Sequence, residues 1–489
     1  MVKSFLFMSF FFIYTILIVY STRSGFYDTY NVEDFFLAGK KLNTFYSTGT
    51  FIATWFSAAS ILGLGSYLYI YGISAVFYSI LPWFFGAVLL YFLSETIRKS
   101  NIHTFPEFFQ EKYNSQLLQI SSSIIMIISY IFYITMQIKG FGMVMSMLLD
   151  IPYTLSLLLV YLYIFYTTFG GLFSVVKSDA LNASVIFVSF LIFAVYVVML
   201  NKGLTNLYIN AINVDTPPLL TWNISTPKGG LLDPFCKGLR PPLYLLSSFF
   251  GWGLGLAANP QYIIRIISAK SDKTAKNMIV YSLIILSLIY FFVIFGSIGL
   301  RVLIPIFIDS SNKNIDDIVP LLFNRIAPSW ITGVFLIGII AASVSTANSE
   351  LLLISTSFWN DLLKRFYKNL DDEDKILNIN RTLIGIAGTV SMILSLNPPK
   401  NLIEYGGNIW GIFSSSIFVP LYATMFIKKP KKISAEISFF SGLITYMLFF
   451  ILQNRTNISF IKLIHPGMPG FIVSLLGFIA GELKKHEEH

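Results

Sequence analysis

The run GIIAASVSTANSELLLIST, residues 338–356, places small polar side chains inside an apolar segment. If the run is helical, Ala342, Ser345 and Thr346 share one face, because residues three and four apart are neighbours on a helix. That face offers a backbone carbonyl and two hydroxyls. A hard cation such as sodium prefers oxygen ligands, and uncharged ones bind it weakly enough for release. The alternative is that both hydroxyls only bond to carbonyls four residues earlier in their own helix.

Two other apolar runs are interrupted by glycines and small polar residues. They are FIATWFSAASILGLG at 51–65 and LLSSFFGWGLGLAANP at 245–260. Once the first apolar run of the chain is set aside, they are the first and sixth of the remaining series. Interrupted hydrophobic segments at matching positions of two halves are typical of inverted-repeat transporters. The alternative is that the small residues only form packing faces between helices.

Long apolar helices must position these residues. The chain has 489 residues, of which 55% are hydrophobic and 12% charged, and its mean hydropathy is +0.70. Apolar runs of about 20 residues, enough to cross ~30 Å of hydrocarbon, recur along the whole chain. We expect an all-α integral membrane protein with about 13 transmembrane helices. The expected spans are 4–21, 45–71, 74–97, 115–138, 153–170, 178–200, 242–259, 277–304, 331–357, 377–396, 404–427, 433–452 and 465–482.

The loops predict the orientation in the membrane. Basic residues concentrate in alternate loops, for example Arg265, Lys270, Lys273 and Lys276. The positive-inside rule then places the N-terminus outside and the C-terminus in the cytoplasm. The net charge of +9 is explained by topology, so we expect lipid and no nucleic acid as a partner. We expect a multi-pass protein of the plasma membrane with one chain as the functional unit.

The same pattern divides the chain into five segments. An extra N-terminal helix with an inner loop covers 1–44, and the first repeat of five helices covers 45–200. An outer loop covers 201–241, the second repeat covers 242–428, and two C-terminal helices with a tail cover 429–489. The single cysteine, Cys236, excludes an intramolecular disulfide. Because the spans offer few nucleophiles, acids or metal ligands, we expect no enzyme and no organic cofactor.

Four stretches, taken in order, resemble the sodium:solute symporter family, which includes sodium/proline and sodium/glucose cotransporters. They are NVEDFFLAGK with the following IATWFSAASILG, then GGLFSVVKSDA, NPQYIIRIISAKS and GIIAASVSTANSELLLIST, beginning at residues 31, 52, 170, 259 and 338. The resemblance covers residues 30–430. It implies a LeuT-type five-plus-five inverted repeat, preceded by one extra helix and followed by two.

The resemblance also implies a sodium site where the broken first core helix meets the eighth. Its ligands are the carbonyls of Ala53, Phe56 and Ala342 and the hydroxyls of Ser345 and Thr346. Sodium is thus the expected coupling ion. Asp179 matches an acidic position that the family links to sodium binding and release. A second sodium would use Asp179, Ser345, Asn348 and Ser349, although Asn348 departs from the usual pattern.

The solute is expected beside this site. By resemblance, Tyr262 matches an aromatic residue that closes the inner side of the cavity, and Asn259 is placed to contact solute. Mid-membrane position adds a further set, namely Ser57, Ser60, Trp83, Trp252, Gly255, Asn408 and Trp410. This set has few amides and charges, and each unpaired polar group on a sugar costs about 1–3 kcal/mol. A small zwitterion or monocarboxylate is therefore favoured over a polyol.

Two charged residues need separate interpretation. Glu350 stands where the family usually has an apolar residue, and an acid inside a membrane is often functional. It faces an inner vestibule, pairs with a lysine or carries a proton, and a structural or vestibule role is favoured. Lys139 either attracts an anionic solute or reaches the membrane interface as a snorkelling lysine.

Together these features predict a sodium-coupled secondary active symporter that moves a small organic solute by alternating access. An amino acid such as proline, or a monocarboxylate, is the expected solute. The alternative is a proton-coupled or sodium-independent transporter of the same fold.

Overall fold

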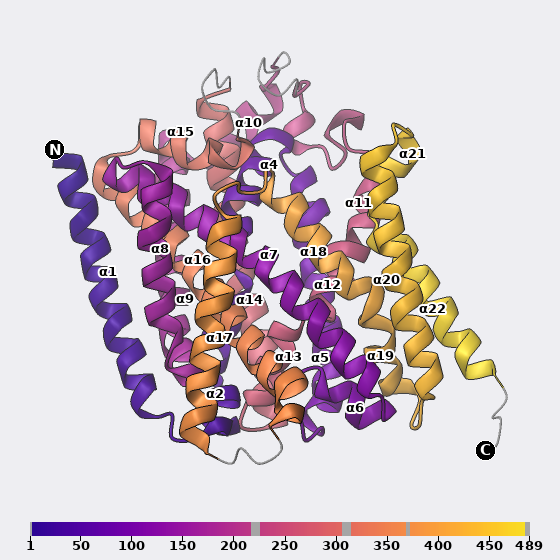
Figure 1. Cartoon of the computed structure of the whole chain (residues 1–489). Coiled ribbons are helices and arrows are strands. Elements are labelled where there is room, and N and C mark those ends of the chain that lie inside the picture. The colour runs from indigo at the N-terminus through magenta and orange to yellow at the C-terminus, as the bar shows by residue number, and fades with distance from the viewer. Residues whose placement is uncertain (1, 217–224, 306–313, 368–371, 485–489) are drawn as a thin grey trace.

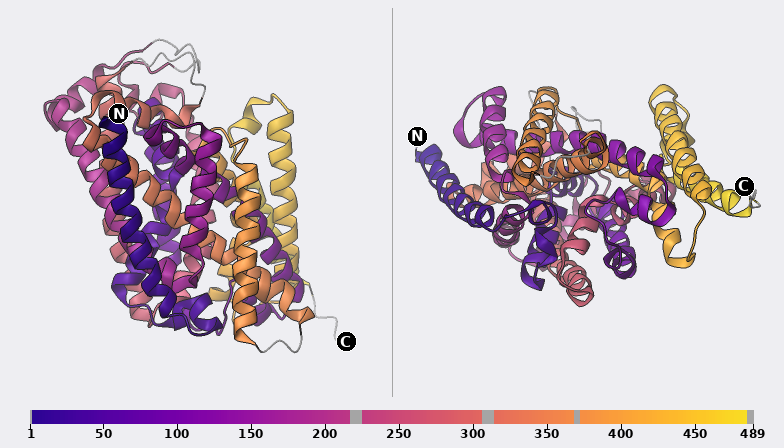
Figure 2. Two further views of the ribbon diagram at one scale, coloured as in Figure 1. Left: turned by 60° about the vertical axis from the view of Figure 1, so that its left-hand side comes forward. Right: turned by 60° about the horizontal axis from the view of Figure 1, so that its bottom comes forward.

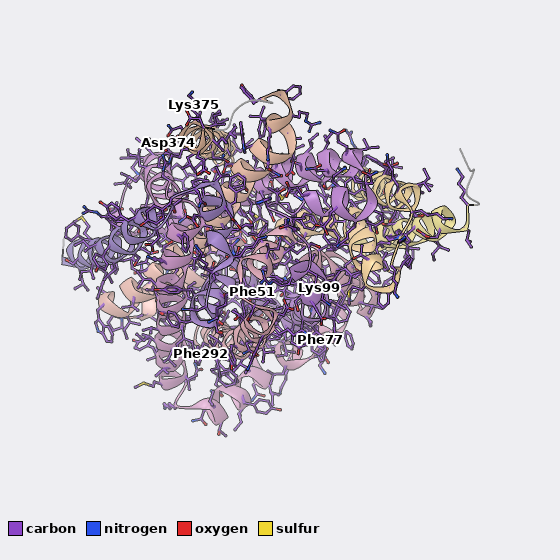
Figure 3. The ribbon with its side chains drawn as sticks, turned by 90° about the horizontal axis from the view of Figure 1, so that it is seen from below. Phe51, Phe77, Lys99, Phe292, Asp374 and Lys375 are labelled. Carbon is purple, nitrogen blue, oxygen red and sulfur yellow. The ribbon has the colours of Figure 1, made fainter. Side chains whose placement is uncertain are left out.

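The structure is a computed structural model that describes residues 2–216, 225–305, 314–367 and 372–484. In these ranges the chain is helical, and β-pairing is limited to isolated bridges between Leu42 and Ala269 and between Thr216 and Thr226. The helices run between two faces (Figure 1). We call the face where the first helix begins the upper face, and the opposite face, which carries Lys99 and Lys375, the lower face (Figure 3).

The first half of the chain contains ten α-helices. They are α1 (Val2–Tyr27), α2 (Val32–Leu37), α3 (Thr44–Trp55), α4 (Leu64–Tyr71), α5 (Leu81–Arg98), α6 (Glu107–Tyr113), α7 (Gln116–Leu149), α8 (Tyr153–Thr168), α9 (Gly171–Leu200) and α10 (Leu204–Asn213). Two π-helical turns, Ala59–Gly63 and Val76–Ile80, lead into α4 and α5.

The remainder contains α11 (Pro242–Ser248), α12 (Leu254–Ala257), α13 (Pro260–Ser268), α14 (Asp272–Leu303), α15 (Ile318–Ile326), α16 (Ser329–Ser357), α17 (Glu373–Leu394), α18 (Leu402–Ser416), α19 (Phe418–Phe426), α20 (Lys432–Arg455), α21 (Ser459–Lys462) and α22 (Gly467–Leu483). Further π-helical turns cover Phe249–Gly253 and Phe358–Leu363.

Both runs that were predicted to be interrupted are broken. Helix α3 ends at Trp55, and the chain continues through a π-helical turn into α4 at a bend of 57°. In the second run, α12 ends at Ala257 and α13 starts at Pro260. Asn259 caps α13 by accepting a hydrogen bond from the Gln261 amide, and Pro260 fits the first helical turn because its missing N–H is not needed there. This segment therefore extends beyond its predicted end at residue 259, to Ser268.

Helix α16 lies at the centre of the molecule. Of its most apolar window, 89% is buried, against 22% for α1. It packs against α9, α7, α17, α1 and α3. Helix α1 covers α9 and α16 at one end of the cross-section, and the pair α20 and α22 lies at the opposite end (Figure 2). The central helix is therefore the one that carries the hydroxyl-rich run.

The all-α membrane fold predicted from the sequence is confirmed. Among the described residues, eight helices are long and apolar enough to cross a membrane, and ten if the bent pairs α3/α4 and α18/α19 each count as one span. Helix α22 and residues Tyr153–Ile164 of α8 form shorter apolar helices. The count of about 13 spans and the five segment boundaries stay predictions.

Candidate ion and solute site

Helices α3 and α16 meet through the hydroxyls of α16. The Ser345 hydroxyl lies 2.8 Å from the Ala53 carbonyl oxygen, and that of Thr346 lies 3.4 Å from the Thr54 carbonyl oxygen. The same hydroxyls also bond back within α16, Ser345 to Ala341 at 2.8 Å and Thr346 to Ala342 at 3.1 Å. The back-bonding within the helix is thus observed, but it is not the whole of the contacts, and cation binding by this face stays a prediction. The bonds to α3 bring Ala53, Ala342, Ser345 and Thr346 together in the buried core.

The break after α3 frees backbone groups beside this contact. Phe56 ends α3 with φ −82° and ψ 102°, so the helical hydrogen-bond pattern stops at this residue. The amide of Ala58 donates to Oε1 of Gln137 in α7 at 3.0 Å, and the amide of Ser57 donates to the Ser60 hydroxyl at 3.3 Å. A side chain of another helix therefore replaces a helical partner, which an interrupted helix needs inside hydrocarbon.

The chemistry of this contact suits a weakly held monovalent cation. Ala53, Phe56, Ala342, Ser345 and Thr346 offer carbonyl and hydroxyl oxygens only, and all five residues are buried. Carbonyl and hydroxyl oxygens are the ligand type that a hard cation prefers. Phe56 could contribute only its carbonyl at the break, because its ring packs on Phe190 at 5.0 Å between centroids.

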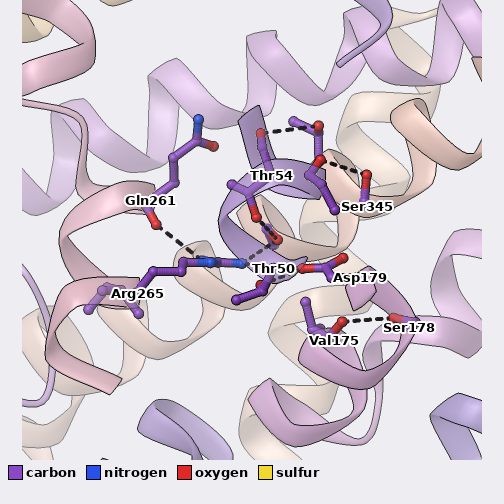
Figure 4. Close-up of polar contacts among 12 residues, drawn as sticks. Thr50, Thr54, Val175, Ser178, Asp179, Gln261, Arg265 and Ser345 are labelled. Atoms are coloured by element: carbon purple, nitrogen blue, oxygen red, sulfur yellow. Dashed lines mark hydrogen bonds and ion pairs between the residues drawn. The ribbon is translucent and has the colours of Figure 1, made fainter. Parts of the chain in front are cut away.

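An acid and an arginine lie one helical turn from this contact (Figure 4). Oδ2 of Asp179 in α9 accepts a hydrogen bond from the Thr50 hydroxyl at 2.6 Å and lies 3.8 Å from Nη2 of Arg265 in α13. Arg265 also donates to the hydroxyl of Ser349, which lies 3.2 Å from the Thr54 hydroxyl. The side chain of Arg265 is 1% exposed. Arg265 was counted among the loop residues in the sequence, and that placement is wrong.

The predicted second sodium site is therefore shared with a cation of the chain itself. Arg265 contacts both Asp179 and Ser349. Asn348 has its Oδ1 on the hydroxyls of Thr167 and Thr168 in α8, at 2.9 and 3.0 Å. A second sodium at these residues stays a prediction.

Glu350 is fully buried in α16. Among the described residues neither of its carboxylate oxygens has a hydrogen-bond partner. The charged side chain that acts on it is Arg265, and the hydroxyls of Tyr130 and Tyr133 in α7 lie within its electrostatic reach. Glu350 is therefore enclosed by the described residues, and the role of this acid stays a prediction.

Aromatic side chains form a closed cluster beside the break in α3. Trp252 lies between Trp83 and Trp410, with ring centroids 5.0 and 4.9 Å apart. Tyr262 and Tyr133 each approach Trp410 at 6.0 Å. None of these five rings is more than 2% exposed. We call these five residues the aromatic chamber.

Two of the remaining predicted solute residues, Ser57 and Gly255, contact the aromatic chamber. The Ser57 hydroxyl lies 3.5 Å from that of Tyr133. A Cβ on Gly255 would lie 2.5 Å from the Trp410 carbonyl oxygen, so only glycine lets α12 approach α18 this closely. Asn259 accepts a hydrogen bond from the Tyr130 hydroxyl at 2.6 Å. Ser60, by contrast, is engaged with the Ser57 amide at the break.

Polar contacts join elements at the upper face. Nζ of Lys139 in α7 lies 2.5 Å from Oδ2 of Asp316, and both side chains are almost fully buried. Asp316 also accepts a hydrogen bond from the amide of Leu402, the first residue of α18, at 3.0 Å. Lys139 is thus a buried partner of an acid, so the snorkelling role is wrong, and attraction of an anionic solute stays a prediction.

Sequence reasoning missed three residues that build this region: Gln137, Tyr130 and Arg265. Each is a polar group in an otherwise apolar helix, and that was the signal available. Their partners, Ala58, Asn259 and Asp179, lie at least 79 positions away along the chain. Only the tertiary structure shows these pairs.

The sequence of the chain is similar to those of known transporters. The family model described as "Sodium:solute symporter family" matches residues 35–443. The chain belongs to the sodium:solute symporter family. It is 23% identical to the osmoregulated proline transporter of Bacillus subtilis (strain 168), over 94% of this chain and 91% of the relative. It is also 23% identical to the sodium/pantothenate symporter of Escherichia coli (strain K12), over 95% and 92% of the two chains.

Solved structures share the fold. A sodium-coupled sialic acid symporter in a substrate-bound outward-open state aligns with a TM-score of 0.77 at 16% identity, covering 98% of this chain and 96% of that one. Mhp1, a transporter of the nucleobase-cation-symport-1 family, aligns in a closed conformation with a TM-score of 0.57 at 12% identity, covering 91% and 93%. At these identities the likeness establishes the membrane-transporter fold of the family and not the solute.

Proposed function

We propose that the protein is a sodium-coupled symporter of a small organic solute. The observation that carries this proposal is the contact between the broken helix α3 and the hydroxyls of α16, where Ser345 bonds to the Ala53 carbonyl. Sodium would bind between these helices through Ala53, Phe56, Ala342, Ser345 and Thr346. Membership of a family whose relatives include sodium/proline and sodium/pantothenate symporters supports the same assignment.

The proposed cycle is alternating access between the two faces. Sodium replaces the hydrogen bonds between the α16 hydroxyls and the α3 carbonyls, which ties the two helices together by ion–oxygen contacts. Solute and sodium then favour the same state, so each tightens the other by an equal factor. One sodium that moves inward across 100 mV gains about 2.3 kcal/mol from voltage alone.

The aromatic chamber, which includes Trp252, is the proposed solute site, with Ser57, Gly255 and Asn259 near it. Buried donors there have no partner in the part of the chain that the structure describes, namely the indole N–H groups of Trp83, Trp252 and Trp410 and the side-chain amide nitrogens of Gln137 and Asn259. Unsatisfied buried donors favour a ligand that brings acceptors. A carboxylate on a small apolar body, as in proline or a monocarboxylate, satisfies both features.

Tyr262 is the proposed gate on the lower side. It is fully buried and its ring packs on Phe51 at 5.2 Å and on Trp55 at 5.7 Å, both in α3. Its hydroxyl has no partner within the described ranges. Movement of α13 relative to α3 would separate these rings and open the chamber to the lower face, which we assign to the cytoplasm.

Uptake into proteoliposomes tests this function. Purified protein should accumulate labelled proline or a monocarboxylate only under an inward sodium gradient, and choline in place of sodium should abolish uptake. The S345A/T346A variant removes two ligands and should raise the half-saturating sodium concentration at least tenfold. A melting-temperature screen of amino acids and monocarboxylates, with and without sodium, selects the solute.

The matched control is S355A/T356A, which removes the same two groups further along α16. Within the described ranges those hydroxyls bond to carbonyls of their own helix, at Leu352 and Leu353. Sodium dependence should stay at the wild-type value in this control. Uptake that continues at full rate in choline, driven by a pH gradient or by the solute gradient alone, would instead support the proton-coupled or sodium-independent alternative.

A further inference from the structure

A fully buried glutamate in α16 has no direct partner. Both oxygens of Glu350 are enclosed and lack a hydrogen bond among the described residues. A buried carboxylate without compensation is strongly unfavourable, and acids inside membranes normally pair with another group. The structure therefore raises the question of which positive charge balances Glu350.

The basic side chains near Glu350 do not neutralise its negative charge. Arg265 acts on Glu350 only through its field, since among the described residues the two form no ion pair within 4.0 Å, and its guanidinium faces Asp179 at 3.8 Å and donates to Ser349 and to the Gln261 carbonyl. The guanidinium thus pairs with one of the two carboxylates, Asp179, and leaves Glu350 without a direct partner among the described residues. Lys139, a buried lysine nearer the upper face, forms an ion pair with Asp316. The group formed by Asp179, Arg265 and Glu350, which we call the charge cluster, has a net charge of minus one when both acids are ionised.

The proposed sodium site lacks a charge of the opposite sign. Its five ligands are carbonyl and hydroxyl oxygens, so nothing in the first layer neutralises the ion. Glu350 follows Thr346 by four residues and lies on the same side of α16, about 6 Å along the helix axis. Ser349, which carries one of the Arg265 bonds, follows Ser345 by the same interval. The charge cluster is therefore the charged group next to the ion.

We infer that Glu350 is the counter-charge of the transported sodium ion. It does not coordinate the ion; it acts through its field on a site built from neutral ligands. With one sodium bound, the charge cluster and the ion together are neutral. This inference rests on the proposed sodium site, and it assigns Glu350 the role of setting sodium affinity.

The E350Q variant tests the inference, because glutamine keeps the shape and removes the charge. For charges on the order of 8 Å apart at an effective dielectric constant of about 20, Coulomb's law predicts about a thirtyfold rise in the half-saturating sodium concentration. The half-saturating solute concentration at saturating sodium should change less than threefold. E350D keeps the charge and should stay within about fivefold of wild type.

A matched control is E436Q in α20, which removes an acid that is bonded to Ser115 and far from the ion site. Its sodium dependence should equal that of wild type. A second comparison uses Arg265: R265Q/E350Q has the same cluster charge as wild type and should recover sodium affinity relative to E350Q. A role confined to packing predicts no such recovery.

The outcomes separate this inference from the proposed function. If uptake by wild type needs no sodium, the proposed function fails, and the inference with it. If S345A/T346A loses sodium dependence but E350Q keeps the wild-type half-saturation, only the inference is overturned. If E350Q is not recovered in folded form, R265Q should bind sodium more tightly than R265Q/E350Q, and equal affinities reject the counter-charge role.

Discussion

Single hydroxyls and glycines decide the geometry of the site. Ser345 bonds both to its own helix and to the Ala53 carbonyl of α3, so one side chain serves the helix interior and the interhelical contact. Gly255 contributes through the absence of a side chain. Its missing Cβ lets the backbone of α12 lie against the Trp410 carbonyl. Both features depend on groups no larger than a methyl.

At this scale we expect G255A to be destabilising. The new Cβ would lie 2.5 Å from the Trp410 carbonyl oxygen and 2.8 Å from its Cβ, so either helix must shift. Overpacking of this kind costs about 1–3 kcal/mol. The variant should melt at a lower temperature and bind solute more weakly, as measured by thermal unfolding with and without solute.

G388A is the control for this change. Gly388 lies in α17, and its nearest neighbours would meet a Cβ at 3.6 Å or more, an ordinary contact. Its melting temperature should equal or exceed that of wild type. Equal melting temperatures for G255A and wild type would show that α12 and α18 are not held at this distance.

The sequence singled out the hydroxyls that join α16 to α3 but not the residues around them. Ser345 and Thr346 are found by their spacing in an apolar run, because helical periodicity acts over three or four residues. Gln137 and Arg265 are found only when their partners are known, because the contacts join distant segments. Local sequence patterns therefore could not reveal the residues that surround this contact.

Among the elements, the start of α18 is tied to α7 through one buried ion pair. Lys139 and Asp316 are 2.5 Å apart, and Asp316 also holds the Leu402 amide that begins α18. Lys139 donates in addition to the Pro399 carbonyl at 2.8 Å. This arrangement holds the upper end of α18 against α7 in the present state.

We expect K139M to lower the free energy of unfolding by about 3–5 kcal/mol, because it leaves Asp316 buried without its partner. Unfolding in detergent, followed by circular dichroism, measures the change. Lys177, whose ion pair with Asp28 is partly exposed, provides the control. K177M should cost about 1 kcal/mol or less. Equal losses in the two variants would argue against the buried pair as a structural link.

The elements themselves were largely predictable. The runs at 51–65 and 245–260 were identified as interrupted because glycines and small residues stand where leucine is expected in hydrocarbon. The restart of the second helix at Pro260 was not foreseen, because Asn259-Pro260 was taken as an end. An asparagine before a proline is also a helix start, and the sequence does not say which applies here.

For the whole molecule, the orientation in the membrane is the prediction to test. The chain has a single cysteine, and burial raises the pKa of the Cys236 thiol to about 11, so little thiolate is present at neutral pH. Because Cys236 is the single cysteine, the C236S variant has no thiol, and single cysteines can be introduced into it one at a time. In intact cells an impermeant maleimide should label R455C at the upper face, and should label K375C at the lower face only after permeabilisation. The reverse pattern would place the N-terminus in the cytoplasm.

The burial of α16 along nearly its whole length has a mechanical consequence. A helix enclosed by α9, α7, α17, α1 and α3 is shielded from lipid, so in the proposed alternating-access cycle it would stay fixed while its neighbours tilt around it. New solute preferences would then arise most readily from changes on the tilting helices. Substitutions on α16 would disturb its packing against all of these surrounding helices at once.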